Sequence, residues 1–215
     1  MTQIEKTLFW TWFEQYHKEL FDLPNKSDVE FQHWQNELSE HLETLHQDFK
    51  GIITHEKQEA ILTVTVDGIS DLFNEVDDLV AEAPVITGWK FSALLPPGCY
   101  DKLIEKLKIE VGIDPKEFRF TFCMPKPNKR AEIVVFHPLY TPEIDIMMFD
   151  LADRTILNLL GERSYGNNIE VIDLKNLSDA EHDKLESMSV LPTIFNSGFV
   201  VDREGVLVGL AWNKK

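Results

Sequence analysis

The sequence predicts an α/β protein of the α+β type, in which an N-terminal helical hairpin packs on a sheet built from two tandem ββαβ units. Three observations support this prediction. Apolar residues recur at steps of three and four over residues 3–21 and 27–47, which is typical of amphipathic helices. From residue 51 the apolar period shortens to that of strands. The order strand, strand, helix, strand then occurs twice, which indicates an internal structural repeat.

The helical hairpin is predicted from periodicity and from its end signals. The first helix covers residues 3–21 and ends before Pro24. Ser27 and Glu30 have the spacing of a capping box, so a second helix should begin there and run to about residue 47. A short connection between two helices favours an antiparallel pair.

Each ββαβ unit is predicted from two apolar strands around a turn, an amphipathic helix and a third strand. In the first unit these elements are residues 51–55, 60–66, 69–83 and 89–95. In the second unit they are residues 118–123, 131–136, a helix after Thr141 that ends at Gly161, and 169–174. Residues 99–115 are ambiguous; one interpretation is a short helix over 100–106 followed by a strand over 107–111.

The C-terminal part looks added to the repeat. Ser178 and Glu181 predict another capping box and a short helix to about residue 188, and residues 199–201 and 206–210 predict a β-hairpin. The expected parts are a helical hairpin, a first unit, a second unit with its linker, and a C-terminal helix and hairpin: residues 1–48, 49–98, 99–176 and 177–215. One continuous sheet and two separate lobes both fit this order.

The charge balance excludes several classes of partner. The chain has 215 residues, with 37 acidic and 21 basic ones, for a net charge of −16. Such an anion repels nucleic acid and anionic lipid. No apolar stretch is long enough to cross a bilayer, and the first residues lack the features of a signal peptide. Cys99 and Cys123 are too few for a disulfide framework, so we expect a cytoplasmic protein.

Several short segments follow one another along the chain: Phe9-Trp10-x-Trp12-Phe13, Val66-Asp67-Gly68, the segment from Ala81-Glu82-Ala83-Pro84 to Gly88-Trp89-Lys90-Phe91-x-Ala93, Asp114-Pro115, and Asp153 followed by Leu159-Leu160-Gly161-Glu162 and Ile169-Glu170-Val171. Together they resemble an uncharacterised family of bacterial cytoplasmic proteins. The resemblance covers about residues 8–175, and residues 185–215 depart from the family's pattern. The family carries no assigned activity, so the resemblance implies a fold and no chemistry.

Three groups of residues could carry chemistry, and each has a plainer explanation. His33, Glu37 and His41 share one helix face at metal-ligand spacing, but a solvated face explains them and H-E-x-x-H is absent. Cys99 could open a helix whose dipole lowers the thiol pKa, with His137 as a base. Three acids could form a catalytic pair, although helix surface and caps explain them as well: Asp150, Asp153 and Glu162. The sequence therefore predicts no catalytic residue, no metal site and no cofactor.

Two surfaces are candidates for partner binding. The polar side of the predicted helix 69–83 carries only acids, where a solvated face usually mixes charges: Asp71, Glu75, Asp77, Asp78 and Glu82. On the first helix, Trp10, His17 and Phe21 lie away from the centre of the apolar arc. Such a second apolar side is either buried within the chain or exposed to a partner, which includes a second copy of the chain.

The sequence thus favours a non-catalytic acidic binding protein that engages a basic protein partner. One version is an immunity or regulator-type protein, since an acidic face can imitate the phosphate backbone that a nuclease binds. The alternative is an enzyme or small-molecule binder that uses a groove between the two ββαβ units. Binding through charge should weaken strongly with salt, whereas binding in a groove should not.

Overall fold

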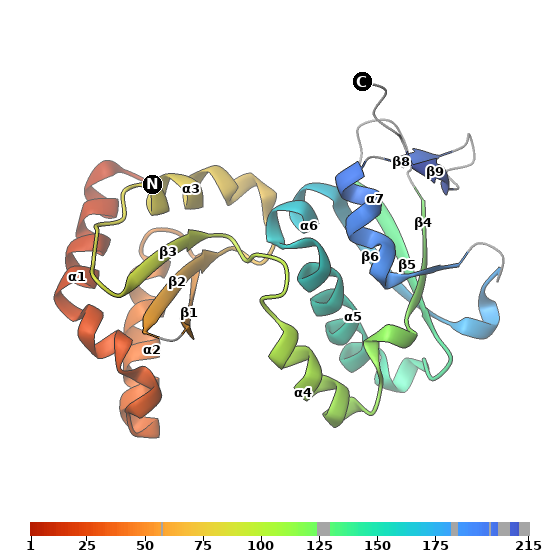
Figure 1. Ribbon diagram of the computed structural model, residues 1–215, viewed down its shortest axis with the longest axis horizontal. Coiled ribbons are helices and arrows are strands. Elements are labelled where there is room, and N and C mark those ends of the chain that lie inside the picture. Colours follow the sequence, from red (N-terminus) through yellow and green to blue (C-terminus); the bar gives the residue numbers. More distant parts are fainter. Residues whose placement is uncertain (57, 124–129, 182–184, 198, 202–206, 211–215) are drawn as a thin grey trace. The chain divides into compact units, whose positions relative to one another are not determined.

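The computed structural model describes the chain except for residues 57, 124–129, 182–184, 198, 202–206 and 211–215, together with the side chains of a few residues beside these gaps (Figure 1). The chain divides into two compact units, Met1–Leu95 (unit 1) and Pro96–Lys215 (unit 2). The predicted mixed α/β fold class is confirmed. The two ββαβ units form separate sheets, of three strands in unit 1 and four in unit 2.

Unit 1 begins with the helical hairpin and continues with a three-stranded sheet. Its elements are α1 (Gln3–Phe21), α2 (Asp28–Glu43), β1 (Lys50–Glu56), β2 (Glu59–Thr65), α3 (Phe73–Ala81) and β3 (Trp89–Ala93). The strand β1 pairs antiparallel with β2, and β3 pairs parallel with β2 on its other side. The helix α3 is therefore the crossover between two parallel neighbours.

Side-chain caps fix the starts of both helices of the hairpin. Ser27 and Glu30 form the predicted capping box at α2. Thr2 and Glu5 form a second, unpredicted capping box at α1. Each box satisfies two backbone N–H groups that would otherwise lack a partner.

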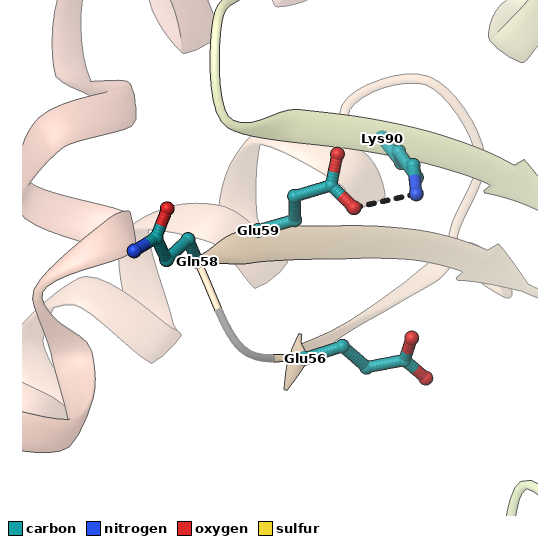
Figure 2. Close-up of a pocket in the computed structure, with 4 residues that line it drawn as sticks. All are labelled: Glu56, Gln58, Glu59 and Lys90. Atoms are coloured by element: carbon teal, nitrogen blue, oxygen red, sulfur yellow. Dashed lines mark hydrogen bonds and ion pairs between the residues drawn. The ribbon is translucent and has the colours of Figure 1, made fainter.

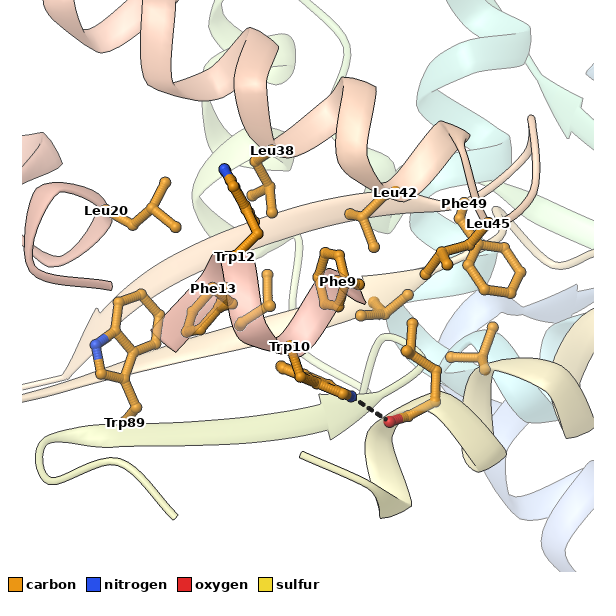
Figure 3. Packing of buried hydrophobic residues seen from close by; sticks show 14 of the residues in the cluster. Phe9, Trp10, Trp12, Phe13, Leu20, Leu38, Leu42, Leu45, Phe49 and Trp89 are labelled. Atoms are coloured by element: carbon orange, nitrogen blue, oxygen red, sulfur yellow. Dashed lines mark hydrogen bonds between the residues drawn. The ribbon is translucent and has the colours of Figure 1, made fainter. Parts of the chain in front are cut away.

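The core of unit 1 is rich in aromatic rings from α1. Figure 3 shows Phe9 of α1 close to Leu42 of α2, and Phe13 of α1 beside Trp89 of β3. The ring of Phe13 lies 4.9 Å from that of Trp89 in an edge-on arrangement. The indole Nε1 of Trp10 donates a hydrogen bond to the carbonyl of Leu79 on α3, at 2.9 Å. The helix α1 thus packs against both α2 and α3, which explains why it is apolar on two sides.

Unit 2 contains the second ββαβ order with several added elements. Its elements are α4 (Asp101–Val111), β4 (Arg119–Cys123), β5 (Ala131–His137), α5 (Asp145–Leu160), α6 (Glu162–Asn168), β6 (Ile169–Asn176), β7 (Glu186–Ser187), α7 (Leu191–Ser197), β8 (Phe199–Val201) and β9 (Leu207–Leu210). The strand order is β6-β5-β4-β7, and β8 pairs with β9. As in unit 1, the first two strands are antiparallel and the third is parallel to the second.

Asn158 of α5 holds the beginning of unit 2 through three hydrogen bonds. Its Oδ1 accepts a hydrogen bond from the N–H of Tyr100 at 2.6 Å, and its Nδ2 donates to Asp101 Oδ1 at 2.8 Å. The backbone carbonyl of Asn158 also accepts from the N–H of Gly98 at 2.9 Å. The segment before α4 is therefore fixed against the C-terminal half of α5.

The predicted strand over residues 107–111 is wrong, because α4 continues to Val111 and ends at Gly112. Ile104, Leu107 and Val111 pack against the core of unit 2 at helical spacing, while Ile109 is exposed. Alternating apolar residues in a short run fit a strand and a helix equally well, and the packing decides between them.

The predicted helix from Ser178 to about residue 188 is also wrong in its described part, and residues 182–184 lie outside the described residues. Asn176 accepts a hydrogen bond from the N–H of Ser178 and caps a single 3-10 turn, Leu177–Asp179. Glu186 and Ser187 then pair with β4, and the helix of this region is α7, which was not predicted. The predicted C-terminal hairpin is present as β8 and β9, and its turn lies outside the described residues. Among the described residues, no helix is both long and apolar enough to cross a membrane.

Candidate functional site

Most of the net negative charge belongs to unit 1. Its 95 residues include 18 acidic side chains against 6 lysines and no arginine, for a net charge of −12 of the chain's −16. Unit 2 is longer and has a net charge of only −4. An acidic surface that meets a partner is therefore expected on unit 1.

The helix α3 separates apolar from acidic residues as the sequence predicted. It buries Phe73, Val76 and Leu79 against the core of unit 1. Its other side and the turns beside it are acidic: Asp78 of α3, Asp71 of the 3-10 turn Ser70–Leu72 and the C-cap residue Glu82 are exposed, while Glu75 and Asp77 are half-buried. The acidic face is a real feature of the folded unit.

Part of this face is neutralised within unit 1. The ammonium of Lys6 and the amide of Gln3 donate hydrogen bonds to Glu82, and the bond from Lys6 lowers the pKa of that carboxyl. The α-amino group of Met1 lies 3.4 Å from Glu75 Oε2. The carboxylates of Asp71 and Asp78 have no ion pair or hydrogen bond with any residue that the structure describes. The uncompensated charge of α3 and of the turn before it therefore lies on these two residues.

Some of the acids of unit 1 lie in the last turn of a helix, where negative charge is unfavourable. Asp78 lies in the last turn of α3, and Glu40 and Glu43 lie in the last turn of α2. The C-terminal end of a helix carries partial negative charge, so each exposed acid there costs roughly 0.3–1 kcal/mol. The last turn of α3 holds no basic residue, and that of α2 holds only His41. Residues that break a local rule in this way are often kept for function.

The three aromatic candidates on α1 do not form one surface. Trp10 is buried against α3, which corrects its assignment to a partner-binding patch. Phe21 is half-buried, with its ring edge-on to Trp89 at 6.0 Å and to His55 at 5.7 Å. His17 is half-buried as well, and its Nδ1 lies 2.8 Å from the carbonyl of Glu14. The position of α3, which periodicity does not give, accounts for the burial of Trp10.

Of the two histidines of α2, His41 packs against α1 and His33 is exposed. The ring of His41 stacks on Trp12 with centroids 4.1 Å apart, and His33 lies 5.0 Å from the ring of Trp34. Within the described ranges, no three histidine, cysteine or acidic side chains gather as a metal site would require. His41 therefore has a structural role in joining α2 to α1.

The environment of Cys99 opposes a nucleophilic role. Burial raises the pKa of its thiol from the usual 9.0 to about 11, whereas the predicted position at a helix start would lower it. Glu162 and Asp101 contribute further to this rise. The thiol is thus protonated at neutral pH, when only the thiolate is a good nucleophile.

The three candidate carboxylates are held in separate ways. Asp150 lies 3.5 Å from the guanidinium Nε of Arg154, one helical turn away. Asp153 accepts a hydrogen bond from the hydroxyl of Tyr165 at 2.5 Å. Glu162 is buried in the first turn of α6, a position that the sequence did not reveal. These are the contacts that acidic residues ordinarily make on the surface of a helix or at its start.

His137 is fully buried in unit 2, where its charge state should affect stability. The N–H of Leu139 donates to its Nδ1 at 3.1 Å, so the neutral ring carries its proton on Nε2, which lies 3.4 Å from Glu117 Oε2. Burial lowers the pKa of His137 below its usual 6.5, against the opposite effect of Glu117. Protonation would break the bond from Leu139 and bury a charge.

We expect unit 2 to lose stability as the pH falls below 6.5. A histidine whose pKa is lower in the folded state than in the unfolded state stabilises the fold fully at pH values above its unfolded-state pKa. This stabilisation is lost as the pH falls through the folded-state pKa. The measurement is urea unfolding at about pH 8 and about pH 5.5, followed by hydrogen exchange in β5. The variant His137→Gln should flatten the pH dependence, and exposed His33→Gln should not. Equal pH dependence in wild type and His137→Gln would contradict this prediction.

A surface depression lies at the far end of the β1–β2 hairpin. Its lining is Glu56, Gln58, Glu59 and Lys90 (Figure 2). Lys90 donates to Glu59 at 2.5 Å, which raises the lysine pKa, and Glu56 points away from this pair. Glu56 and Glu59 are cross-strand partners of like charge, so the hairpin end adds to the acidity of unit 1.

Comparison with known proteins assigns no activity. The chain matches no protein-family model, no curated protein and no solved structure. The resemblance to the uncharacterised bacterial family therefore stays a prediction. The groove between the two units also stays a prediction, because their relative placement is not determined.

Proposed function

We propose that the protein is a non-catalytic acidic binding protein that engages a basic protein partner through unit 1. The observation that supports it most is the net charge of −12 in unit 1, with Asp78 exposed on α3 and Asp71 exposed on the 3-10 turn before it. Neither carboxylate is compensated by any described residue. A surface of one sign raises the rate at which a partner of the opposite sign is captured. An immunity or regulator-type protein that covers the basic surface of an enzyme is one form of this function.

The position of Asp78 adds support from stability. An acid at the C-terminal end of α3 destabilises the helix, so selection for stability alone would favour a neutral or basic residue there. A binding role explains why the unfavourable charge is kept. The same reasoning applies to Glu40 and Glu43 at the end of α2.

We predict that the double variant Asp71→Asn/Asp78→Asn binds basic partners more weakly than wild type, and that Asp78→Asn alone is more stable than wild type. Loss of two rim charges should weaken binding about fivefold at low salt, and all charge-driven binding should be largely lost by roughly 0.5 M salt. Asp78→Asn alone should raise the free energy of unfolding by about 0.3–1 kcal/mol. The measurements are capture of proteins from native cytosol at low and high salt, affinity titration of the identified partner, and urea unfolding.

A matched control removes the same charge elsewhere. Glu132→Gln/Glu170→Gln changes two exposed acids on β5 and β6 of unit 2. Binding by this variant should stay within about twofold of wild type. Equal losses in both double variants would show that only total charge matters, and binding that resists high salt would overturn the proposal.

A further inference from the structure

The exposed side of α1 carries two large aliphatic residues that its own unit does not cover. Ile4 is 73% exposed and Leu8 is 64% exposed. They lie one helical turn apart, and the next turn brings Trp12, whose buried ring stacks on His41 of α2. Ile4 and Leu8 therefore form an apolar ridge that continues into the aromatic contact between α1 and α2.

Acidic helix ends lie on both sides of this ridge. On one side, Gln3 and Lys6 hold Glu82 at the end of α3, close to Asp78. On the other side, the stacking of Trp12 on His41 places the last turn of α2 beside α1. That turn includes Glu40 and Glu43, both exposed. The ridge is thus apolar along its crest and negative along its flanks.

We propose that this ridge binds an amphipathic helix of the basic partner. The apolar face of that helix would cover Ile4 and Leu8, and lysine or arginine side chains beside it would pair with Asp78 and with Glu40 and Glu43. A row of residues at steps of four on one helix is the surface that a second helix packs against. This inference rests on the proposed function and names the part of the partner that is recognised.

A second copy of the chain fits the ridge less well. In a symmetric dimer the same patch faces itself, so the acids of α2 and α3 would meet their own copies. Like charges brought together at an interface cost several kcal/mol in general. Charge complementarity therefore selects a basic helix over self-association.

The test uses a synthetic peptide of about 14 leucines and lysines, arranged to form an amphipathic helix, as the probe. A peptide of the same composition in scrambled order has the same charge but no apolar face. Binding of both peptides to the full chain is titrated by tryptophan fluorescence. Leu8→Gln is compared with Val29→Gln, because Val29 is an aliphatic residue of α2 that is 81% exposed and lies in the first turn, away from the last turn beside the ridge.

We expect the amphipathic peptide to bind at least about tenfold more tightly than the scrambled one. Leu8→Gln should weaken its binding about fivefold, while Val29→Gln should leave it within about twofold. Both residues are exposed, so neither variant should affect folding, which circular dichroism checks. Equal binding of the two peptides, or equal effects of the two variants, would overturn the ridge as a docking site.

The same titration separates this inference from the proposed function. If both peptides bind equally and Asp71→Asn/Asp78→Asn weakens both, charge-driven binding stands and the ridge has no role. If that double variant binds both peptides as wild type does, the acidic face itself is not a binding surface and both proposals fail.

Discussion

Replacing Gly161 with alanine is expected to destabilise unit 2 by about 3 kcal/mol. Gly161 joins α5 to α6 with φ of 72° and ψ of 156°, a conformation that is essentially restricted to glycine. An added Cβ would lie 2.7 Å from Cδ and 3.1 Å from the backbone nitrogen of Pro97. Pro97 cannot move away easily, because Asn158 holds the next residues against α5. Backbone strain and steric overlap therefore act together.

The measurement is urea unfolding of the full chain, with hydrogen exchange followed separately in α5 and α1. The loss should appear in α5 and leave α1 unchanged. Gly112→Ala is the matched control, because Gly112 also has φ of 72° but no atom lies within 4 Å of an added Cβ. Strain alone should cost about 1 kcal/mol there. Equal losses in the two variants would show that contact with Pro97 adds nothing.

Replacing Phe13 with alanine is expected to destabilise unit 1 by about 3–5 kcal/mol. Its side chain is fully buried, and its ring lies 4.9 Å from Trp89, 5.4 Å from Phe91 and 5.8 Å from Trp10. Removing the ring leaves a cavity between α1 and β3 that rigid aromatic neighbours cannot fill. The cost includes both the lost burial and the edge-on ring contacts.

Tryptophan fluorescence reports this loss directly. Four of the five tryptophans lie in unit 1: Trp10, Trp12, Trp34 and Trp89. Leu8→Ala in the same helix is the control, and it should cost less than about 1 kcal/mol because Leu8 is largely exposed. A loss below about 1 kcal/mol for Phe13→Ala would mean that the aromatic cluster repacks around the gap.

Local signals in the sequence were sufficient for much of the fold. Ser27 and Glu30 marked the start of α2, and the change of apolar period marked both ββαβ orders. Errors arose where one pattern fits two structures. Leu107, Ile109 and Val111 alternate as in a strand, and only the packing of α4 on the core shows that Ile109 is left outside. Near residue 178, the capping residue is Asn176 and not the Ser178 that the sequence had predicted.

The candidate site was predictable only in part, for a related reason. The acidic face of α3 follows from helical spacing within one segment, and the structure retains it. The pairing of Lys6 with Glu82 joins residues 76 apart in sequence, and the burial of Trp10 depends on α3. Likewise, the raised pKa of Cys99 comes from burial, which no local motif reveals. Contacts between distant segments decide which charges remain open to a partner.

The continuity of unit 1 along the chain has a consequence for biosynthesis. All of its elements lie within Met1–Leu95, and its last strand, β3, ends at Ala93. The unit can therefore close while the rest of the polypeptide is still being translated, since domains fold as units during synthesis. Its strong negative charge also repels the ribosomal RNA around the exit tunnel, so the nascent unit should not adhere to that surface and should be free to fold.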